Sequence, residues 1–100
     1  MKIVFLASSH NDLRWFKKYY VSVFPMGRKK ADERYLATLT ILRQNPMAGH
    51  TSETVLGARE FHITRTPFSF LYRVTKENVE IMRVIDGRSN WDQHVLQDEK

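Results

Sequence analysis

The chain has 100 residues, of which 42% are hydrophobic and 12% aromatic, a composition typical of one small domain with a modest core. It contains no cysteine, which excludes disulfides and cysteine-ligated metal sites, and no apolar run approaches the roughly 20 residues of a membrane span. The formal net charge of +5 favours an anionic partner, either nucleic acid or an acidic protein segment. We expect a cytoplasmic protein, because the apolar run 3–7 is too short for a secretory signal.

The first half of the chain predicts a strand followed by two helices. Residues 2–7 read as the strand, and Ser9 with Asp12 resembles a capping box at the start of the first helix. Proline and glycine in 25–27 end that helix, and Pro46 stops the second one. Apolar residues recur at helical spacing: Leu13, Phe16, Tyr20 and Phe24 in the first helix, then Ala31, Tyr35, Leu39 and Leu42 in the second. The short connection predicts an antiparallel helical hairpin.

Two further features of this half concern packing and connection. Trp15 and Tyr19 form a second pair on an adjacent face of the first helix, and we expect them to pack against the second helix. A partner-binding face is the alternative for this pair. Residues 47–56, with their glycine and hydroxyl side chains, predict a surface loop.

The second half predicts three strands, at 60–65, 68–74 and 79–85, separated by Pro67 and a polar turn. Connections this short join antiparallel neighbours, so these strands should form a meander. The chain is then an α+β domain in which a helical hairpin packs on one face of the sheet. The predicted core consists of Leu13, Phe16, Leu39, Leu42, Phe61, Phe70, Tyr72 and Val84.

The motifs of this half also resemble a known family. The strand Tyr72-Arg73-Val74, the strand 79–84 (Val-Glu-Ile-Met-Arg-Val) and the ending Gly-Arg-Ser-Asn-Trp at 87–91 follow one another in order. Together they resemble toxins of the RelE/ParE superfamily of type II toxin–antitoxin systems, and most closely the ParE branch. The resemblance covers about residues 1–92. It implies a microbial-ribonuclease-like fold in one toxin domain, 1–92, followed by a polar tail, 93–100, and a cognate antitoxin that binds the toxin as a hetero-oligomer.

Strand alternation assigns side chains to the sheet face that the helices leave open. The large apolar residues of 68–74 take the helix side, so Leu71 and Arg73 face the open side. Burying an unpaired Arg83 under the helices is costly, so we place Arg83, Val79 and Ile81 on the open face and Met82 in the core. The residues predicted to contact the target or the antitoxin are Arg59, His62, Leu71, Arg73, Ile81, Arg83, Arg88 and Trp91.

A RelE-like ribonuclease is one function that this face allows. His62 would act as acid or base, and Arg73, Arg83 and Arg88 would hold the phosphate, with the ribosome and mRNA as partners. The chain departs from the cluster that this resemblance implies, since the two lysines of that cluster fall at His62 and Thr64, its arginine at Ser69 and its tyrosine at Trp91. Arg73 and Arg83 have a simpler explanation in ion pairs with Glu60 or Glu80 across the sheet.

The ParE branch implies a poison of DNA gyrase with no catalytic residues, and this is the function that we expect. Gly87, Arg88 and Trp91 would then help to form the functional C-terminal end, although Asp86 replaces the histidine that is frequent in the family. A plain nucleic-acid-binding domain is a third hypothesis from the basic charge, but the sequence lacks a recognition-helix signature. The histidines show no metal-ligand spacing, and we expect neither a metal nor a cofactor.

Overall fold

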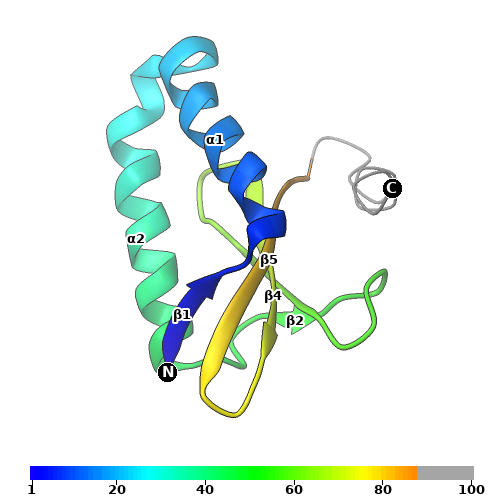
Figure 1. Ribbon diagram of the computed structural model, residues 1–100. Coiled ribbons are helices and arrows are strands. Elements are labelled where there is room, and N and C mark those ends of the chain that lie inside the picture. The colour runs from blue at the N-terminus through cyan, green and yellow to red at the C-terminus, as the bar shows by residue number, and fades with distance from the viewer. Residues whose placement is uncertain (88–100) are drawn as a thin grey trace.

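The computed structural model describes residues 1–87 and shows two α-helices covering one face of a five-stranded sheet (Figure 1). The α+β class predicted from the sequence is confirmed. The helices are α1 (His10–Lys18) and α2 (Arg28–Gln44), joined by a π-helical turn (Tyr19–Val23) and a 3-10 turn (Pro25–Gly27). The strands are β1 (Lys2–Phe5), β2 (His50–Thr51), β3 (Arg59–His62), β4 (Phe68–Val74) and β5 (Asn78–Asp86).

The strands lie in the order β1-β5-β4-β3-β2. Strands β3, β4 and β5 pair antiparallel with their chain neighbours, and β1 joins β5 in parallel, with Lys2 opposite Asn78 and Phe5 opposite Ile81. Strand β2 adds a short antiparallel edge to β3, so the prediction that 47–56 is only a loop was wrong at this point. Its two-residue length gave no alternating pattern from which a strand could be recognised.

Two predicted strand boundaries and one predicted helix cap also need correction. The first strand ends at Phe5 because residues 7–9 turn into a 3-10 helix. Strand β3 ends at His62 because Arg65 adopts a left-handed φ of 65° in the turn that leads to β4. Ser9 does not cap α1, since its hydroxyl donates to Leu6 O at 2.7 Å. Asp12, the other half of the predicted capping box, has a different role that is described below.

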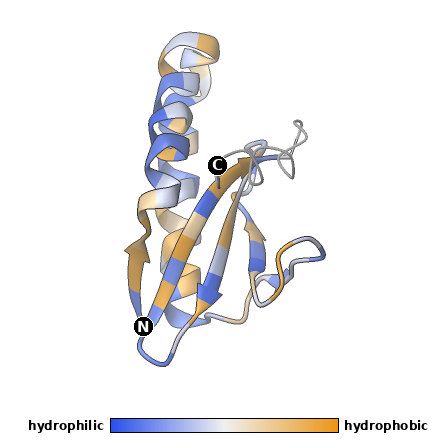
Figure 2. Cartoon of the chain, turned by 45° about the vertical axis from the view of Figure 1, so that its right-hand side comes forward, coloured by the Kyte–Doolittle hydropathy of each residue, from blue (hydrophilic) through white to orange (hydrophobic). Residues whose placement is uncertain are grey.

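One apolar cluster joins both helices to the sheet. It contains Phe16, Tyr19, Tyr20, Ala31, Leu39 and Leu42 from the helical half, and Ile63, Phe68, Phe70, Tyr72, Val79, Ile81 and Val84 from the sheet half. Figure 2 shows apolar residues interspersed with polar ones along β5, whereas β1 is mainly apolar. Of the predicted core, Leu13 and Phe61 are only partly buried, and the other six residues are buried. The two residues predicted to pair on the first helix differ in burial, because Tyr19 is buried whereas Trp15 is 44% exposed.

The aromatic rings pack mainly edge to face. The Phe16 ring lies 5.0 Å from that of Phe68 at 75°, a geometry that aromatic pairs favour. Tyr35 lies between Phe16 and Phe70, with ring centroids 5.4 Å and 5.6 Å away. Burial in this apolar setting raises the pKa of the Tyr35 hydroxyl. These contacts fix the angle at which the hairpin crosses the sheet.

Leu39→Ala should destabilise the protein by about 2–3 kcal/mol, toward the lower end for a buried leucine, since Leu39 keeps 8% exposure at the rim of the cluster. Chemical denaturation of the two proteins gives this difference. Leu36→Ala on the same helix is the control, because Leu36 is 62% exposed and its truncation should leave the free energy of unfolding nearly unchanged. Equal losses in the two variants would contradict the burial of Leu39.

A β-bulge decides which residues of β5 face the helices. The register moves from Leu71 opposite Arg83 to Tyr72 opposite Ile81, which leaves Met82 without a partner in the β4 ladder. The extra residue places Ile81 and Val84 on the same face. The predictions that Val79 and Ile81 face the open side and that Met82 belongs to the core were therefore wrong: Val79 and Ile81 are fully buried and Met82 is partly exposed.

Candidate functional site

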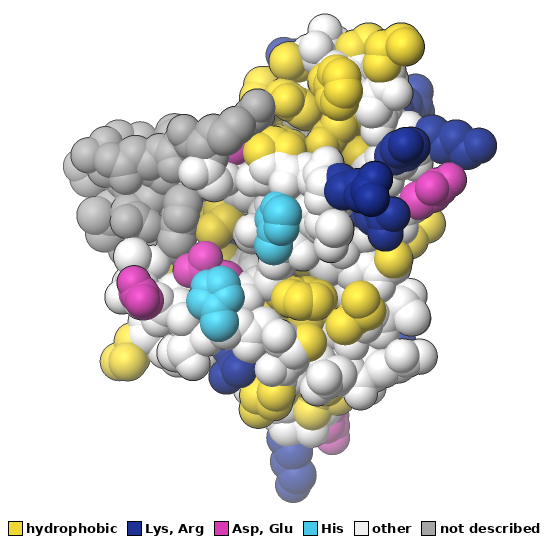
Figure 3. Space-filling view, turned by 180° about the vertical axis from the view of Figure 1, so that it is seen from behind, with side chains coloured by type: hydrophobic (Ala, Val, Ile, Leu, Met, Phe, Trp, Pro, Cys, Tyr) yellow, Lys and Arg dark blue, Asp and Glu magenta, His cyan; other side chains and the backbone are white. Residues whose placement is uncertain are grey.

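The sheet face opposite the helices carries mixed polar and apolar side chains in rows across the strands. One row runs from His50 through Glu60 and Leu71 to Arg83, as the strand registers show. His62 lies opposite Ser69 in a neighbouring row. Viewed from behind, the molecule shows a histidine side chain next to acidic side chains (Figure 3). The His50 ring lies 3.9 Å from the Glu60 carboxylate.

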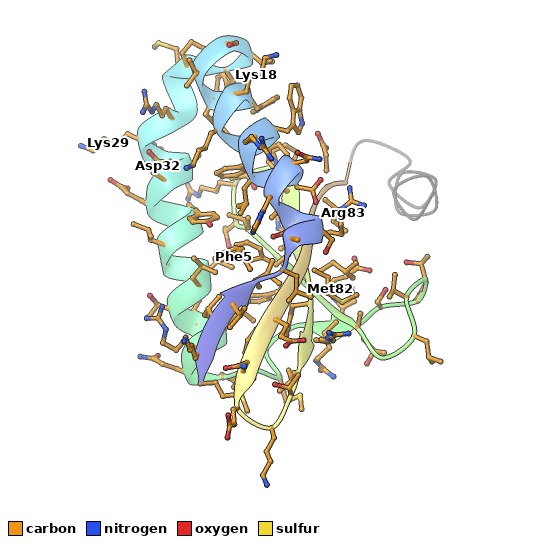
Figure 4. The ribbon with its side chains drawn as sticks, in the orientation of Figure 1. Phe5, Lys18, Lys29, Asp32, Met82 and Arg83 are labelled. Atoms are coloured by element: carbon orange, nitrogen blue, oxygen red, sulfur yellow. The ribbon has the colours of Figure 1, made fainter. Side chains whose placement is uncertain are left out.

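Arg83 forms the most buried ion pair among the described residues of this region. Its Nε and Nη2 donate to the Asp12 carboxylate at 2.6 Å and 2.9 Å, and Asp12 also accepts the backbone N–H of Val84 at 3.0 Å. The two side chains are only 11% and 14% exposed. Figure 4 shows Arg83 beside the first turn of α1. Two parallel bonds to a carboxylate make this a specific and well-held pair.

Asp12 also closes an open edge of the sheet. Strand β1 covers β5 only as far as Ile81, and beyond that point Ser8 donates to Met82 O at 2.7 Å. Asp12 then accepts the next free N–H, that of Val84. Side chains from the 3-10 turn at residues 7–9 and from the first turn of α1 thus occupy backbone groups to which another strand could otherwise bind. This role was not predicted from the sequence, because helix capping already explained an aspartate at that position.

Arg73 and His62 are also engaged by neighbouring groups. Arg73 Nε donates to Glu80 at 2.5 Å, which is the cross-strand pair considered from the sequence, although the Arg73 side chain is 51% exposed. His62 Nε2 lies 2.6 Å from Thr66 O. Because a carbonyl oxygen can only accept, the His62 ring must carry its proton on Nε2 in this contact.

Arg59 lies on the helix side of the sheet, opposite Tyr72, so its predicted place beside the open face was wrong. Strand alternation puts Arg59 on the face of Phe61 and opposite to that of His62. Its guanidinium donates to Met47 O and to Gly49 O, at 3.3 Å and 2.7 Å. Arg59 therefore ties the segment that follows α2 to the sheet.

Tyr72 holds the same segment from β4. Its hydroxyl donates to Pro46 O at 2.7 Å and accepts the N–H of Gly49 at 3.0 Å. The sequence pattern predicted Tyr72 only as a core residue and did not single out Gly49. The sequence signals for this contact were Pro46, Gly49 and the hydroxyl of Tyr72, which is a polar group on a residue of an otherwise apolar strand face.

The residues predicted to contact the target or the antitoxin do not all lie on one face of the sheet. His62, Arg73 and Arg83 share the face opposite the helices, as predicted, and Leu71 lies on that face but is 1% exposed. Ile81 is in the core and Arg59 is on the other side. Arg88 and Trp91 lie outside the described residues, as does the polar tail 93–100.

Residues 1–87 contain no group of three histidine, aspartate or glutamate side chains arranged to hold a metal ion. Among these same residues, no helix is long and apolar enough to cross a membrane. The described residues instead form paired charges around a partly apolar sheet face.

A two-helix layer on a five-stranded mixed sheet, with no metal cluster among its described residues, defines a small α+β domain whose class matches the predicted toxin fold. The family described as ParE toxin of type II toxin–antitoxin system, parDE, matches residues 3–91. The chain therefore belongs to the ParE toxin family.

A solved structure described as the chromosomal ParDE TA system from P. aeruginosa contains a chain similar to this one. The two chains are 29% identical and superpose with a TM-score of 0.68, over 86% of this chain and 95% of the other. A comparison with curated proteins gave no match.

Proposed function

We propose that this chain is the toxin of a type II toxin–antitoxin pair, that it inhibits DNA gyrase by binding to it, and that a cognate antitoxin neutralises it. Membership of the ParE family supports the toxin role. The gyrase target rests on the resemblance of the strand motifs and the Gly-Arg-x-x-Trp ending to the ParE branch. The toxin domain would extend over residues 1–92.

The ion pair of Arg83 with Asp12 is the observation that favours binding over RNA cleavage. Holding a phosphate in the transition state needs cations whose charge is available to it. Arg83 is already engaged by both oxygens of a mostly buried carboxylate, and exchanging that partner would leave Asp12 buried without its cation. Arg73 is likewise engaged by Glu80. A ribonuclease built from His62, Arg73 and Arg83 would first have to break these contacts.

An antitoxin partner is supported by the charge of the chain and by its similarity to a chain of a solved ParDE system. The net charge of +5 suits an acidic or charge-mixed segment that folds as it binds. Such a segment would run along the helical hairpin or pair with an edge strand of the sheet. The complex would be a hetero-oligomer.

The purified protein should inhibit supercoiling by gyrase or trap cleaved DNA, and it should not cut mRNA in a translating ribosome mixture. The His62 ring is engaged with a backbone carbonyl in a turn and has no bond-making role in this mechanism. Codon-spaced mRNA cuts that vanish in His62→Ala would overturn the proposal and support the RelE-like function.

Induced expression gives a second readout for the same proposal. A DNA damage response is expected with gyrase poisoning, whereas translation arrest would indicate mRNA cleavage. Binding to generic duplex DNA should be weak at physiological salt. Tight binding that falls steeply with added salt would instead favour a plain nucleic-acid-binding domain.

A further inference from the structure

The end of the helical hairpin carries an unusual concentration of charge. Residues 13–31 contain six basic residues and no acidic one, although the whole chain has 16 basic and 11 acidic residues. This segment thus carries more positive charge than the net +5 of the chain, and the rest is slightly acidic. The six cations are all exposed, and none forms an ion pair with the part of the chain that is described: Arg14, Lys17, Lys18, Arg28, Lys29 and Lys30.

Large apolar side chains are exposed between these cations. Val21, Val23, Phe24 and Met26 are 56%, 58%, 49% and 91% exposed, although each belongs to a residue type that is usually buried. They occupy the connection between α1 and α2, which lies at the end of the hairpin farthest from β1 (Figure 1). We call these four residues and the six cations the hairpin tip. Of its cations, Lys18 lies on α1 and Lys29 on α2 (Figure 4).

The backbone holds this apolar group in a defined arrangement. The N–H of Phe24 donates to Tyr19 O at 2.8 Å, five residues back, which closes a π-helical turn. The Phe24 ring lies against Gly27, where an added Cβ would approach the ring to 2.5 Å, and 6.2 Å from the Tyr20 ring. The π-helical turn keeps Tyr19 and Tyr20 in the core, and the residues that follow are exposed. The Phe24 side chain is therefore held by local packing.

We propose that the hairpin tip is the surface by which the toxin binds its target, and that the target presents an apolar recess bordered by carboxylates. This inference rests on the proposed function, because it assigns the target contact to one surface. A fixed aromatic and a methionine in an exposed apolar group, with arginine nearby, have the composition of interface hot spots. The surrounding cations require negative charge on the partner and would accelerate association.

The shape of the tip favours this occupant over the others. Phosphates of DNA would pair with the cations but would make no contact with the four apolar residues. A second copy of this chain would bring like charges together, at a cost. An antitoxin segment that folds on binding needs a groove or a strand edge along which to lie, whereas the tip is the protruding end of the hairpin. An anionic lipid surface would fit charge and apolarity, but it does not require side chains held in one arrangement.

Two variants test the two chemical features separately. Val23→Ser with Met26→Ser removes apolar surface, and Lys29→Glu with Lys30→Glu reverses charge. The matched controls are Leu56→Ser, at a residue that is 102% exposed in another loop, and Lys76→Glu, at an exposed lysine in the β4–β5 turn. All four proteins should melt within a few degrees of the wild type, because the changed side chains are exposed.

Affinity for purified gyrase and inhibition of supercoiling should each fall about tenfold or more in both tip variants and stay unchanged in both controls. If both tip variants inhibit supercoiling as strongly as the wild type, the inference is overturned and the gyrase proposal stays intact. Loss of gyrase binding and inhibition in the charge variant alone would indicate a phosphate contact. If the tip variants lose binding to phosphatidylglycerol vesicles but still inhibit gyrase, the tip contacts a membrane. Either result would also overturn it.

Growth arrest on induced expression keeps the inference testable if gyrase is not the target. If the wild type leaves gyrase active but arrests growth, the gyrase proposal fails. In that case expression of the tip variants should not arrest growth, whereas expression of the controls should. Arrest by the tip variants would then refute the tip as the target surface. A wild-type protein that neither inhibits gyrase nor arrests growth would refute both proposals.

Discussion

Gly49→Ala should melt far below the wild-type protein. A Cβ at this position would collide with the backbone oxygen of Glu60 and lie 2.6 Å from the Tyr72 hydroxyl. Neither atom belongs to a flexible side-chain end that can move aside, because Glu60 lies in β3 and the Tyr72 hydroxyl is held by Pro46. Strand β2 would have to move away from β3. We expect a loss of about 3 kcal/mol from this overpacking, which for a domain of this size lowers the melting temperature by about 12–24 °C.

Calorimetry or thermal circular dichroism measures this shift, and two further variants define its origin. Gly87→Ala is the control, because an added Cβ there meets Pro67 O at an ordinary 3.5 Å. Tyr72→Phe should cost about 1–3 kcal/mol, since it leaves the buried N–H of Gly49 without its acceptor. In the Gly49→Ala background, Tyr72→Phe should restore little stability, because the collision with Glu60 remains. Equal melting temperatures for the two glycine variants would contradict this account.

Asp12→Ala should destabilise the protein by about 3 kcal/mol, as expected when one partner of a mostly buried ion pair is removed. The variant leaves the Arg83 guanidinium without its two carboxylate bonds and the N–H of Val84 without its acceptor. It also opens the edge of β5 beyond the end of β1. Urea unfolding gives the difference in free energy, and Asp12→Asn should lose less, because its amide oxygen can still accept from Val84.

The comparison for this prediction is Glu80→Ala, which removes the partner of Arg73. That arginine is 51% exposed, so water and salt screen the pair, and the loss should be below about 1 kcal/mol. A double-mutant cycle between Asp12 and Arg83 should show strong coupling. If Asp12→Ala costs no more than Glu80→Ala, the carboxylate does not hold α1 to the sheet.

Strand β4 and the two helices were predictable because each carries its large apolar residues mainly on one face. In β4 the large apolar residues alternate with smaller or polar ones, so a strand with that orientation was the simplest solution, and Phe68 and Phe70 are both in the core. In the helices the stripes at helical spacing predicted Phe16 and Leu42 as core residues, and both are buried. These predictions succeeded because burial of one face imposes the period of the element on the sequence.

The candidate site was less predictable because its chemistry depends on partners far away in the chain. Arg83 could be placed on the open face, but 71 residues separate it from Asp12, and no local pattern connects them. Arg59 was assigned to the wrong side because the strand was expected to begin one residue later, at Glu60, which left Arg59 outside the alternation. The contact residues Arg88 and Trp91 lie outside the described part of the chain and stay predictions.

The sequence by itself determined the α+β class, the turn at Pro25–Gly27, the helix stop at Pro46 and the family, since each depends on local periodicity, on proline chemistry or on an ordered set of motifs. Only the tertiary structure decided the facing of β5, which is apolar on both sides, so that either orientation buries apolar area until the bulge at Met82 fixes it. The tertiary structure alone also decided that β1 lies parallel to β5 and that Asp12 closes the edge of β5 beyond the end of β1. Strand order and ion pairing arise from contacts between distant segments, and these contacts leave no period in the sequence.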